Sequence, residues 1–240
     1  SALSLSRAMN IHYKTAFVLL HKMRDLMARV NRKIELDGPV AIDVSFYGGH
    51  IRPKNVAKER VDRRKYPYRI AGKSIVVGTV REKSGEKRCL STLLCNEEEL
   101  VDFVFENVYE DEEVHSDCGP FGELDTEYDW RPVNHKVQYS SPEACSNTAE
   151  SVFSQMQKAE DCHGSIARTH AHLYIQEITW RINNNRKCSL SCFHGLGEVL
   201  GEGPSGMKGY WQGSRPWWKR QRDLIWAIRT YEAEKRRTSS

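Results

Sequence analysis

Apolar residues recur along this chain with two different periods, and the changes between them outline a series of helices and strands. Between positions 13 and 36 the apolar residues return every three or four positions, which is the period of an amphipathic helix; they are Ala16, Leu19, Leu20, Met23, Leu26, Met27 and Val30. A shorter amphipathic stretch precedes this segment and ends in a polar break near Asn10. The pair is typical of a helix-turn-helix, and equally of a plain helical hairpin packed on a neighbouring domain.

If these two helices form a helix-turn-helix, the start of the second helix is where DNA would bind. In a helix-turn-helix, the N-terminal end of the second helix contacts bases and phosphates. That end holds His12, Tyr13 and Lys14, which we therefore predict to bind DNA.

Runs rich in β-branched and aromatic residues indicate strands. They lie at 40–48, 73–82, 87–95, 113–119 and 133–139. Amphipathic helices are expected at 96–108, 146–161 and 170–185. The order strand, strand, strand, helix, strand, strand, helix, helix predicts an α/β fold with a mixed sheet flanked by helices.

Composition after residue 186 differs from what precedes it. Residues 195–209 are rich in glycine and predict a linker, and the tail that follows combines tryptophans with many Arg and Lys side chains. We divide the chain into a helix-turn-helix-like segment at 1–36, a core at 37–186, and a linker with a basic Trp-rich tail at 187–240.

Charge and cysteine content limit the class of protein only broadly. The formal net charge of +4 allows a nucleic-acid partner without requiring one. No apolar run approaches the roughly 18–20 residues that a bilayer span needs, so no membrane partner is expected. The seven cysteines are irregularly spaced and indicate reduced thiols in the cytoplasm.

Three acidic residues stand where an α/β nuclease needs them. Asp43 lies within the first strand, Asp117 at the C-terminal end of a later strand, and Glu150 near the start of a helix. Clustered carboxylates hold Mg²⁺ well, because this cation prefers oxygen ligands. Among 32 acidic residues, however, position alone does not separate a metal site from ordinary surface and helix-start carboxylates.

Five local motifs, which follow one another in a set order along the chain, favour a metal site over ordinary surface carboxylates. They are the strand with Asp43, the strand end with Asp117, the pair Asn134-His135, the run Asn147-Thr148-x-Glu150 ending at Lys158, and a helix with Tyr174, Glu177, Arg181 and Asn183. Together they closely resemble the ISXO-like bacterial insertion-sequence transposases, relatives of the eukaryotic Merlin elements.

The resemblance covers about residues 1–186 and carries specific implications. It implies an RNase H-like integrase core and a DDE transposase that cleaves and joins double-stranded DNA at transposon ends and target. It also implies two Mg²⁺ or Mn²⁺ ions on Asp43, Asp117 and Glu150, with His135 in the active site. Transposases of this type are expected to act as homo-oligomers on DNA, here in the bacterial cytoplasm at the nucleoid.

Departures from the family pattern leave alternatives open. Val44 replaces the usual acidic residue after the first Asp, and Lys158 lies one position later than expected. Some members use the Asn as the third catalytic residue, so Asn147 competes with Glu150. The departures also motivate a second hypothesis, a catalytically decayed or domesticated DNA-binding relative.

Basic residues between positions 52 and 69 form an arm too polar for a core. Lys54, Arg63 and Arg64 are its candidates for phosphate contact, and Lys158 is a further DNA-binding candidate. For the C-terminal tail, DNA contact and anchoring of its tryptophans to the core are both open.

Overall fold

The computed structural model describes residues 1–47, 74–83, 86–94, 98–109, 112–117, 128–133, 147–163, 166, 170–201 and 203. In chain order the elements are α1 (Ala2–Met9), α2 (Tyr13–Asn31), β1 (Val40–Tyr47), β2 (Ser74–Lys83), β3 (Glu86–Leu94), α3 (Glu98–Asn107), β4 (Glu113–Asp117), β5 (Asp129–Val133), α4 (Asn147–His163), α5 (Ala171–Asn183) and α6 (Ser189–Leu200). From β1 to α5, this order is the one that the sequence predicts.

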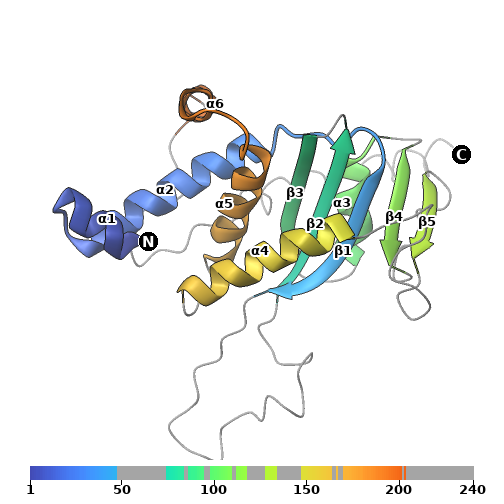
Figure 1. Cartoon of the computed structure of the whole chain (residues 1–240), viewed down its shortest axis with the longest axis horizontal. Helices are drawn as coiled ribbons and strands as arrows, with labels where there is room; N and C mark the ends of the chain where they lie inside the picture. Colours follow the sequence, from blue (N-terminus) through green and yellow to red (C-terminus); the bar gives the residue numbers. More distant parts are fainter. Residues whose placement is uncertain are drawn as a thin grey trace, which may run out of the picture.

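The five strands form one mixed sheet in the order β3-β2-β1-β4-β5 (Figure 1). The first three strands pair antiparallel through consecutive connections. β4 and β5 run parallel to β1, so β1 lies between an antiparallel and a parallel neighbour. The prediction of a mixed α/β fold is therefore confirmed.

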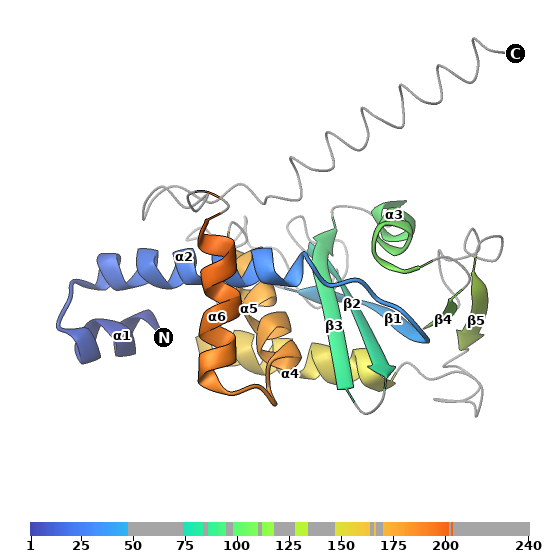
Figure 2. The ribbon, with the colours of Figure 1, turned by 90° about the horizontal axis from the view of Figure 1, so that it is seen from above.

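Side chains alternate between the two faces of the sheet along each strand. Each face packs in a hydrophobic core of its own. Val40 and Ile42 of β1 pack with Leu100 and Val104 of α3 on one face. On the other face, Cys89 and Leu93 of β3 pack with apolar side chains of α4 and α5, which include Val152, Met156, Ile175 and Ile178. Figure 2 shows α3 and α4 on opposite sides of the strands.

A second helical layer begins with α1 and α2. The two helices are joined by a short turn in which Asn10 adopts a left-handed conformation with φ of 51°, a geometry that asparagine tolerates better than most residues. α2 packs along α5, and α6 crosses α2 on its outer side (Figures 1 and 2). Leu26 of α2 packs there with Leu196 and Val199 of α6.

Two boundaries differ from the sequence prediction. The glycine-rich run from residue 195, interpreted as linker, is helical as far as Leu200, because Leu196 and Val199 are buried against α2. The fifth strand is Asp129–Val133, earlier than the predicted 133–139, of which residues 134–139 lie outside the described parts. None of the described helices has the length and apolarity of a bilayer span.

Candidate active site

The parallel pairing of β1 with β4 brings the two predicted catalytic aspartates into neighbouring backbone positions. Ile42 pairs with Ser116, and the next residue along each strand is Asp43 and Asp117 respectively. Asp117 is the last residue of β4 and pairs with Val133 of β5. The two positions therefore lie side by side where β4 ends, although the Asp117 side chain is outside the described part of the structure.

Asp43 lies on the sheet face that α4 covers. Val40 and Ile42 point into the core with α3, and successive side chains of a strand point to opposite faces. The Asp43 side chain is half-buried, and its Oδ1 accepts a hydrogen bond of 2.7 Å from the Val44 N–H. Its partner in β2 is Gly78, which has no side chain to fill the space beside the carboxylate.

Helix α4 brings Glu150 to the same face of the sheet. The helix contacts β1 and β2 and buries Ala149, Val152 and Met156, as its position across these strands in Figure 1 indicates. Glu150 is in the first turn, directly after the buried Ala149, and its side chain is exposed. An exposed carboxylate beside the buried edge of the helix is available to bind a cation.

The donor chemistry of this face suits a hard cation. Asp43 and Glu150 offer oxygen ligands only, and Mg²⁺ binds through one or two carboxylates while it keeps several waters. Among the side chains that the structure describes, no group of three or more His, Cys, Asp or Glu lies close enough to hold a metal ion. Asp117 is not among those side chains.

The remaining predicted site residues are placed only in part. Asn147 is the first residue of α4, and its side chain is outside the described set. Lys158 is exposed about three turns further along the same helix. His135, Lys54, Arg63 and Arg64 lie outside the described residues.

The predicted DNA-contacting residues do lie at the start of the second helix. His12 is the N-cap of α2, and its Nδ1 accepts a hydrogen bond of 3.2 Å from the Lys14 N–H. Tyr13 is 40% exposed, and Lys14 is exposed. The helix that follows is docked along its length on α5.

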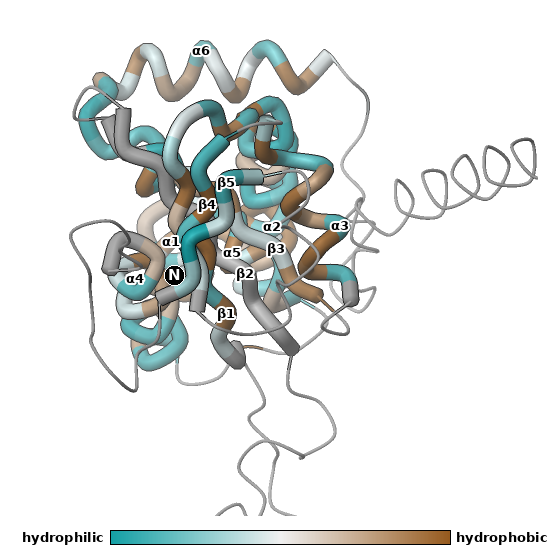
Figure 3. The backbone as a smooth tube through the Cα atoms, turned by 90° about the vertical axis from the view of Figure 1, so that its right-hand side faces the viewer, coloured by the Kyte–Doolittle hydropathy of each residue, from teal (hydrophilic) through white to brown (hydrophobic). Residues whose placement is uncertain are grey.

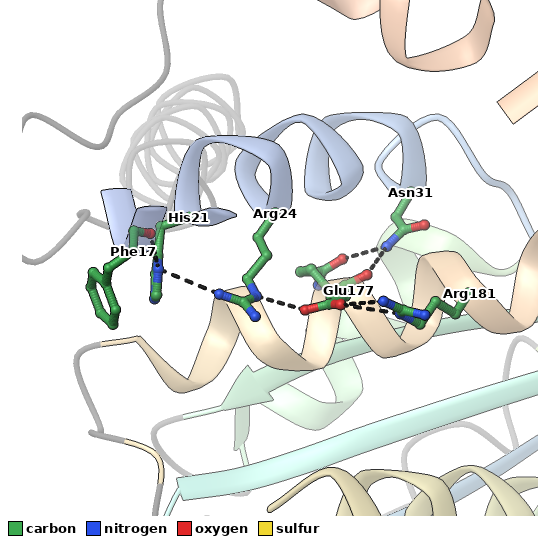
Figure 4. A network of polar contacts seen from close by, with 7 residues as sticks. Phe17, His21, Arg24, Asn31, Glu177 and Arg181 are labelled. Atoms are coloured by element: carbon green, nitrogen blue, oxygen red, sulfur yellow. Dashed lines mark hydrogen bonds and ion pairs between the residues drawn. The ribbon is translucent and has the colours of Figure 1, made fainter. Parts of the chain in front are cut away.

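A charged network, which sequence reasoning missed, joins α2 to α5 (Figure 4). Arg24 of α2 donates from Nε to Glu177 Oε2 at 2.6 Å, and its side chain is only 6% exposed. Its guanidinium lies 4.0 Å from the centre of the Tyr174 ring. Arg181 binds the other oxygen of Glu177 from the solvent side, at 2.7 Å.

The electrostatics of Glu177 follow from this arrangement. Burial raises the pKa of this carboxyl, but the attraction of Arg24 and the hydrogen bonds from Arg181 and Arg24 outweigh burial, so the net pKa is lowered. Glu177 therefore stays ionised as the partner of a buried cation. The Tyr-x-x-Glu…Arg part of the family motif therefore stabilises the contact between α2 and α5 in this chain.

The last motif residue, Asn183, contacts the outer edge of the sheet. Its side-chain amide accepts from the Cys89 N–H at 2.7 Å and donates to the Cys89 carbonyl at 2.8 Å. Gln176 donates to the Ser91 carbonyl at 2.7 Å. Because β3 is an edge strand, these amides satisfy backbone groups that would otherwise lack a partner.

Buried histidines surround the N-terminal half of the α2–α5 contact. Burial lowers the pKa of His21 to about 4 and that of His172 to about 4. His21 stacks on Phe17 with ring centres 4.0 Å apart, and it lies 4.7 Å from the His170 ring. These histidines are neutral near pH 7 and belong to the helix interface.

The sequence carried a weak signal for this interface. The apolar period of α2 indicates one buried face, yet the buried set also contains His21, Arg24, Asp25 and Asn31, and Leu19 is 38% exposed. A count of apolar positions overlooks such residues because it ranks them as solvent-facing. The matching charge and amide groups of α5, Glu177 and Gln176, were the available clue.

A mixed sheet with an aspartate on each of two neighbouring strands, crossed by a helix with a third acid, suits a metal-dependent enzyme of nucleic-acid chemistry. A family profile described as the ISXO2-like transposase domain matches residues 35–183, from just before β1 to the end of α5. The chain therefore belongs to the ISXO2-like transposase domain family. Neither a curated protein nor a solved structure matches it.

Proposed function

We propose that this protein is a DDE transposase with an RNase H-like core that cleaves insertion-sequence ends and joins them to target DNA. The observation that carries the proposal is the β1–β4 register, in which Asp43 and Asp117 take neighbouring backbone positions, together with the packing of α4 on β1. The family match to a transposase domain supports the transposase role itself.

In the proposed site, Asp43, Asp117 and Glu150 would hold Mg²⁺ or Mn²⁺, two ions in all. When bound, such a pair activates the attacking hydroxyl and stabilises the leaving oxygen of an in-line phosphodiester displacement. The chain's own contribution is to fix the direction of the two aspartates on a rigid sheet and that of Glu150 on a helix packed across it. We assign His135 to the same site, to orient a phosphate or move a proton.

DNA binding is proposed for two regions of the chain. His12, Tyr13 and Lys14 would contact one part of the duplex from the start of α2. Lys54, Arg63 and Arg64, together with Lys158 on α4, would contact phosphates nearer the scissile bond. Paired transposon ends then require a homo-oligomer on DNA.

The test is cleavage of DNA that carries the ends of the element encoding this chain, with Mg²⁺ added or chelated. Asp43→Asn and Asp117→Asn should each lower the cleavage rate by roughly 10³-fold or more, because an amide is a neutral and poorer ligand. Asp129→Asn is the matched control, because its exposed carboxylate on β5 pairs with Arg131 and lies outside the proposed site. Undiminished cleavage by either site variant would refute the assignment.

Two further variants decide whether Glu150 or Asn147 is the third catalytic residue. Glu150→Gln abolishes cleavage if the carboxylate is the third ligand, whereas Asn147→Ala does so if the amide takes that role. DNA binding should persist in both proteins. Salt-dependent binding without Mg²⁺-dependent cleavage by the wild type would instead favour the decayed DNA-binding relative.

A further inference from the structure

Helix α6 has one covered face and one uncovered face. Leu196 and Val199 are buried against α2. Leu190, Phe193 and Leu200 point away from that contact and are 77%, 70% and 60% exposed. The tube coloured by hydropathy in Figure 3 shows α6 along the outside of the molecule, with apolar turns on it. Exposed apolar side chains in a row mark a surface that binds something.

The spacing of these exposed residues on α6 indicates that a second helix packs on them. Leu190, Phe193, Gly197 and Leu200 are separated by three, four and three positions, the period of a seam between two packed helices. A Cβ added at Gly197 would meet no atom within 4 Å. The surface at Gly197 is therefore open, so that a large side chain of a second helix could approach the backbone there. We call these four residues the α6 seam.

A segment later in the same chain has the complementary pattern. Trp217, Gln221, Leu224, Ile228 and Tyr231 are separated by four, three, four and three positions, which predicts a helix with an apolar seam whose one polar member is Gln221. Laid antiparallel on α6, this segment pairs all four positions of the α6 seam in register: Leu200 with Gln221, Gly197 with Leu224, Phe193 with Ile228, and Leu190 with Tyr231.

The connection between the two segments allows this pairing. Residues 201–216 include glycines at 201, 203, 206, 209 and 213 and prolines at 204 and 216, a composition typical of a turn or linker. Extended, they reach at most about 55 Å. In the antiparallel register the segment begins beside Leu200, so the connection has to cross only the roughly 8–10 Å between two packed helices. The chain can therefore return along α6 without strain.

We propose that residues 217–231 form a helix that docks antiparallel on the α6 seam of the same chain. The inference goes beyond the transposase assignment and does not depend on it. It gives the tryptophan-rich tail a structural place, as an outer layer over α6. Its test uses the full chain and needs no DNA.

Photocrosslinking tests the contact directly. Phe193 is replaced by p-benzoylphenylalanine, and irradiated protein is digested and sequenced by mass spectrometry, with light and heavy isotope-labelled chains mixed. We expect crosslinks to the segment 221–231 within one chain. The same probe at Leu3, which is 48% exposed on α1, is the control and should not reach that segment. Crosslinks only between light and heavy chains, or none to 221–231, would overturn the proposal.

Limited proteolysis gives an independent result. In the docked helix, tryptic cleavage after Lys219, Arg220, Arg222 and Arg229 should be slow, because a protease needs an unfolded segment. Phe193→Asp should accelerate cleavage there on the order of tenfold, and Leu3→Asp should not change it. If the wild type is cleaved as fast as Phe193→Asp, the tail is not docked on α6.

Discussion

Glu177 shows how a single residue of the family motif stabilises the contact between two helices. Arg24 is almost fully buried on α2, and a buried cation is costly unless a hydrogen-bonded anion compensates it. Glu177 supplies that anion at 2.6 Å and also binds Arg181. The two arginines are not equivalent, because Arg181 is 67% exposed and can return to water.

Removal of the anion should therefore cost far more than removal of the outer arginine. Glu177→Gln leaves Arg24 buried without a counter-charge and should lower the free energy of unfolding by about 3 kcal/mol. Arg181→Gln should cost less than about 1 kcal/mol, as is usual for an exposed ion pair. Urea unfolding measures both, and equal losses in the two variants would contradict this account of the network.

The buried histidines give the fold a dependence on pH. His172 has a pKa of about 4 when folded, below its ordinary value of 6.5, because burial disfavours the charged ring. The unfolded chain then binds the proton more tightly, so the contribution of His172 to stability is complete above pH 6.5 and falls toward pH 4. The limiting slope is about 1.4 kcal/mol per pH unit.

Comparison with His172→Gln isolates this contribution from those of other titrating groups. The difference in unfolding free energy between wild type and variant should shrink as the pH falls from about 6.5 to about 4. Unfolding by urea at several pH values measures it. A difference that stays constant over this range would show that His172 does not titrate as its burial implies.

At the scale of elements, α2 belongs to the folded core although the family match begins after it. The matched range starts at residue 35, yet Asn31 of α2 donates to both the backbone and the side chain of Gln176 on α5. Arg24 and Leu26 add the ion pair and the contact with α6. A helix bound in this way is part of the α5 packing, whatever it contributes to DNA binding.

Two truncations should separate the helices. Removal of residues 1–11 deletes α1 but keeps the His12 cap and every α2–α5 contact, so the midpoint of thermal unfolding should change little. Removal of residues 1–35 exposes the partners of Arg24 and Asn31 and should lower the midpoint by roughly 10 °C or more, or abolish cooperative unfolding. If the shorter chain unfolds at the wild-type midpoint by circular dichroism, α2 is a separate unit.

The sequence predicts these elements well where an apolar period dominates. The strands with Asp43 and Asp117 and the helices α3, α4 and α5 follow from such patterns. Helix α6 does not, because Gly195, Gly197 and Gly201 indicate a linker locally, and only burial of Leu196 and Val199 on α2 stabilises a helix there. The polar α2–α5 interface is not predicted either, because its partners are far apart in the chain.

In the whole molecule, the two ends of the sheet differ: one is joined to the helical layer, and the other holds the two aspartate positions. Its β3 edge is closed by the amides of Asn183 and Gln176 from α5, which joins the sheet to the helical layer of α2 and α6. The opposite half, where β1 meets β4, holds the two neighbouring aspartate positions, and α4 packs on β1 there. The sequence indicated the residues of that site, but their adjacency depends on the parallel register, which no local pattern contains.

We propose that Asp43 and Asp117 bind one catalytic metal site, which can be measured by Mn²⁺ binding followed by electron paramagnetic resonance. Wild type and the Asp129→Asn control should bind Mn²⁺ with the same affinity. Asp43→Asn and Asp117→Asn should each weaken binding by about tenfold or more, since each removes a charged oxygen ligand. Mn²⁺ affinity that is unchanged in both variants would show that these aspartates do not bind the metal.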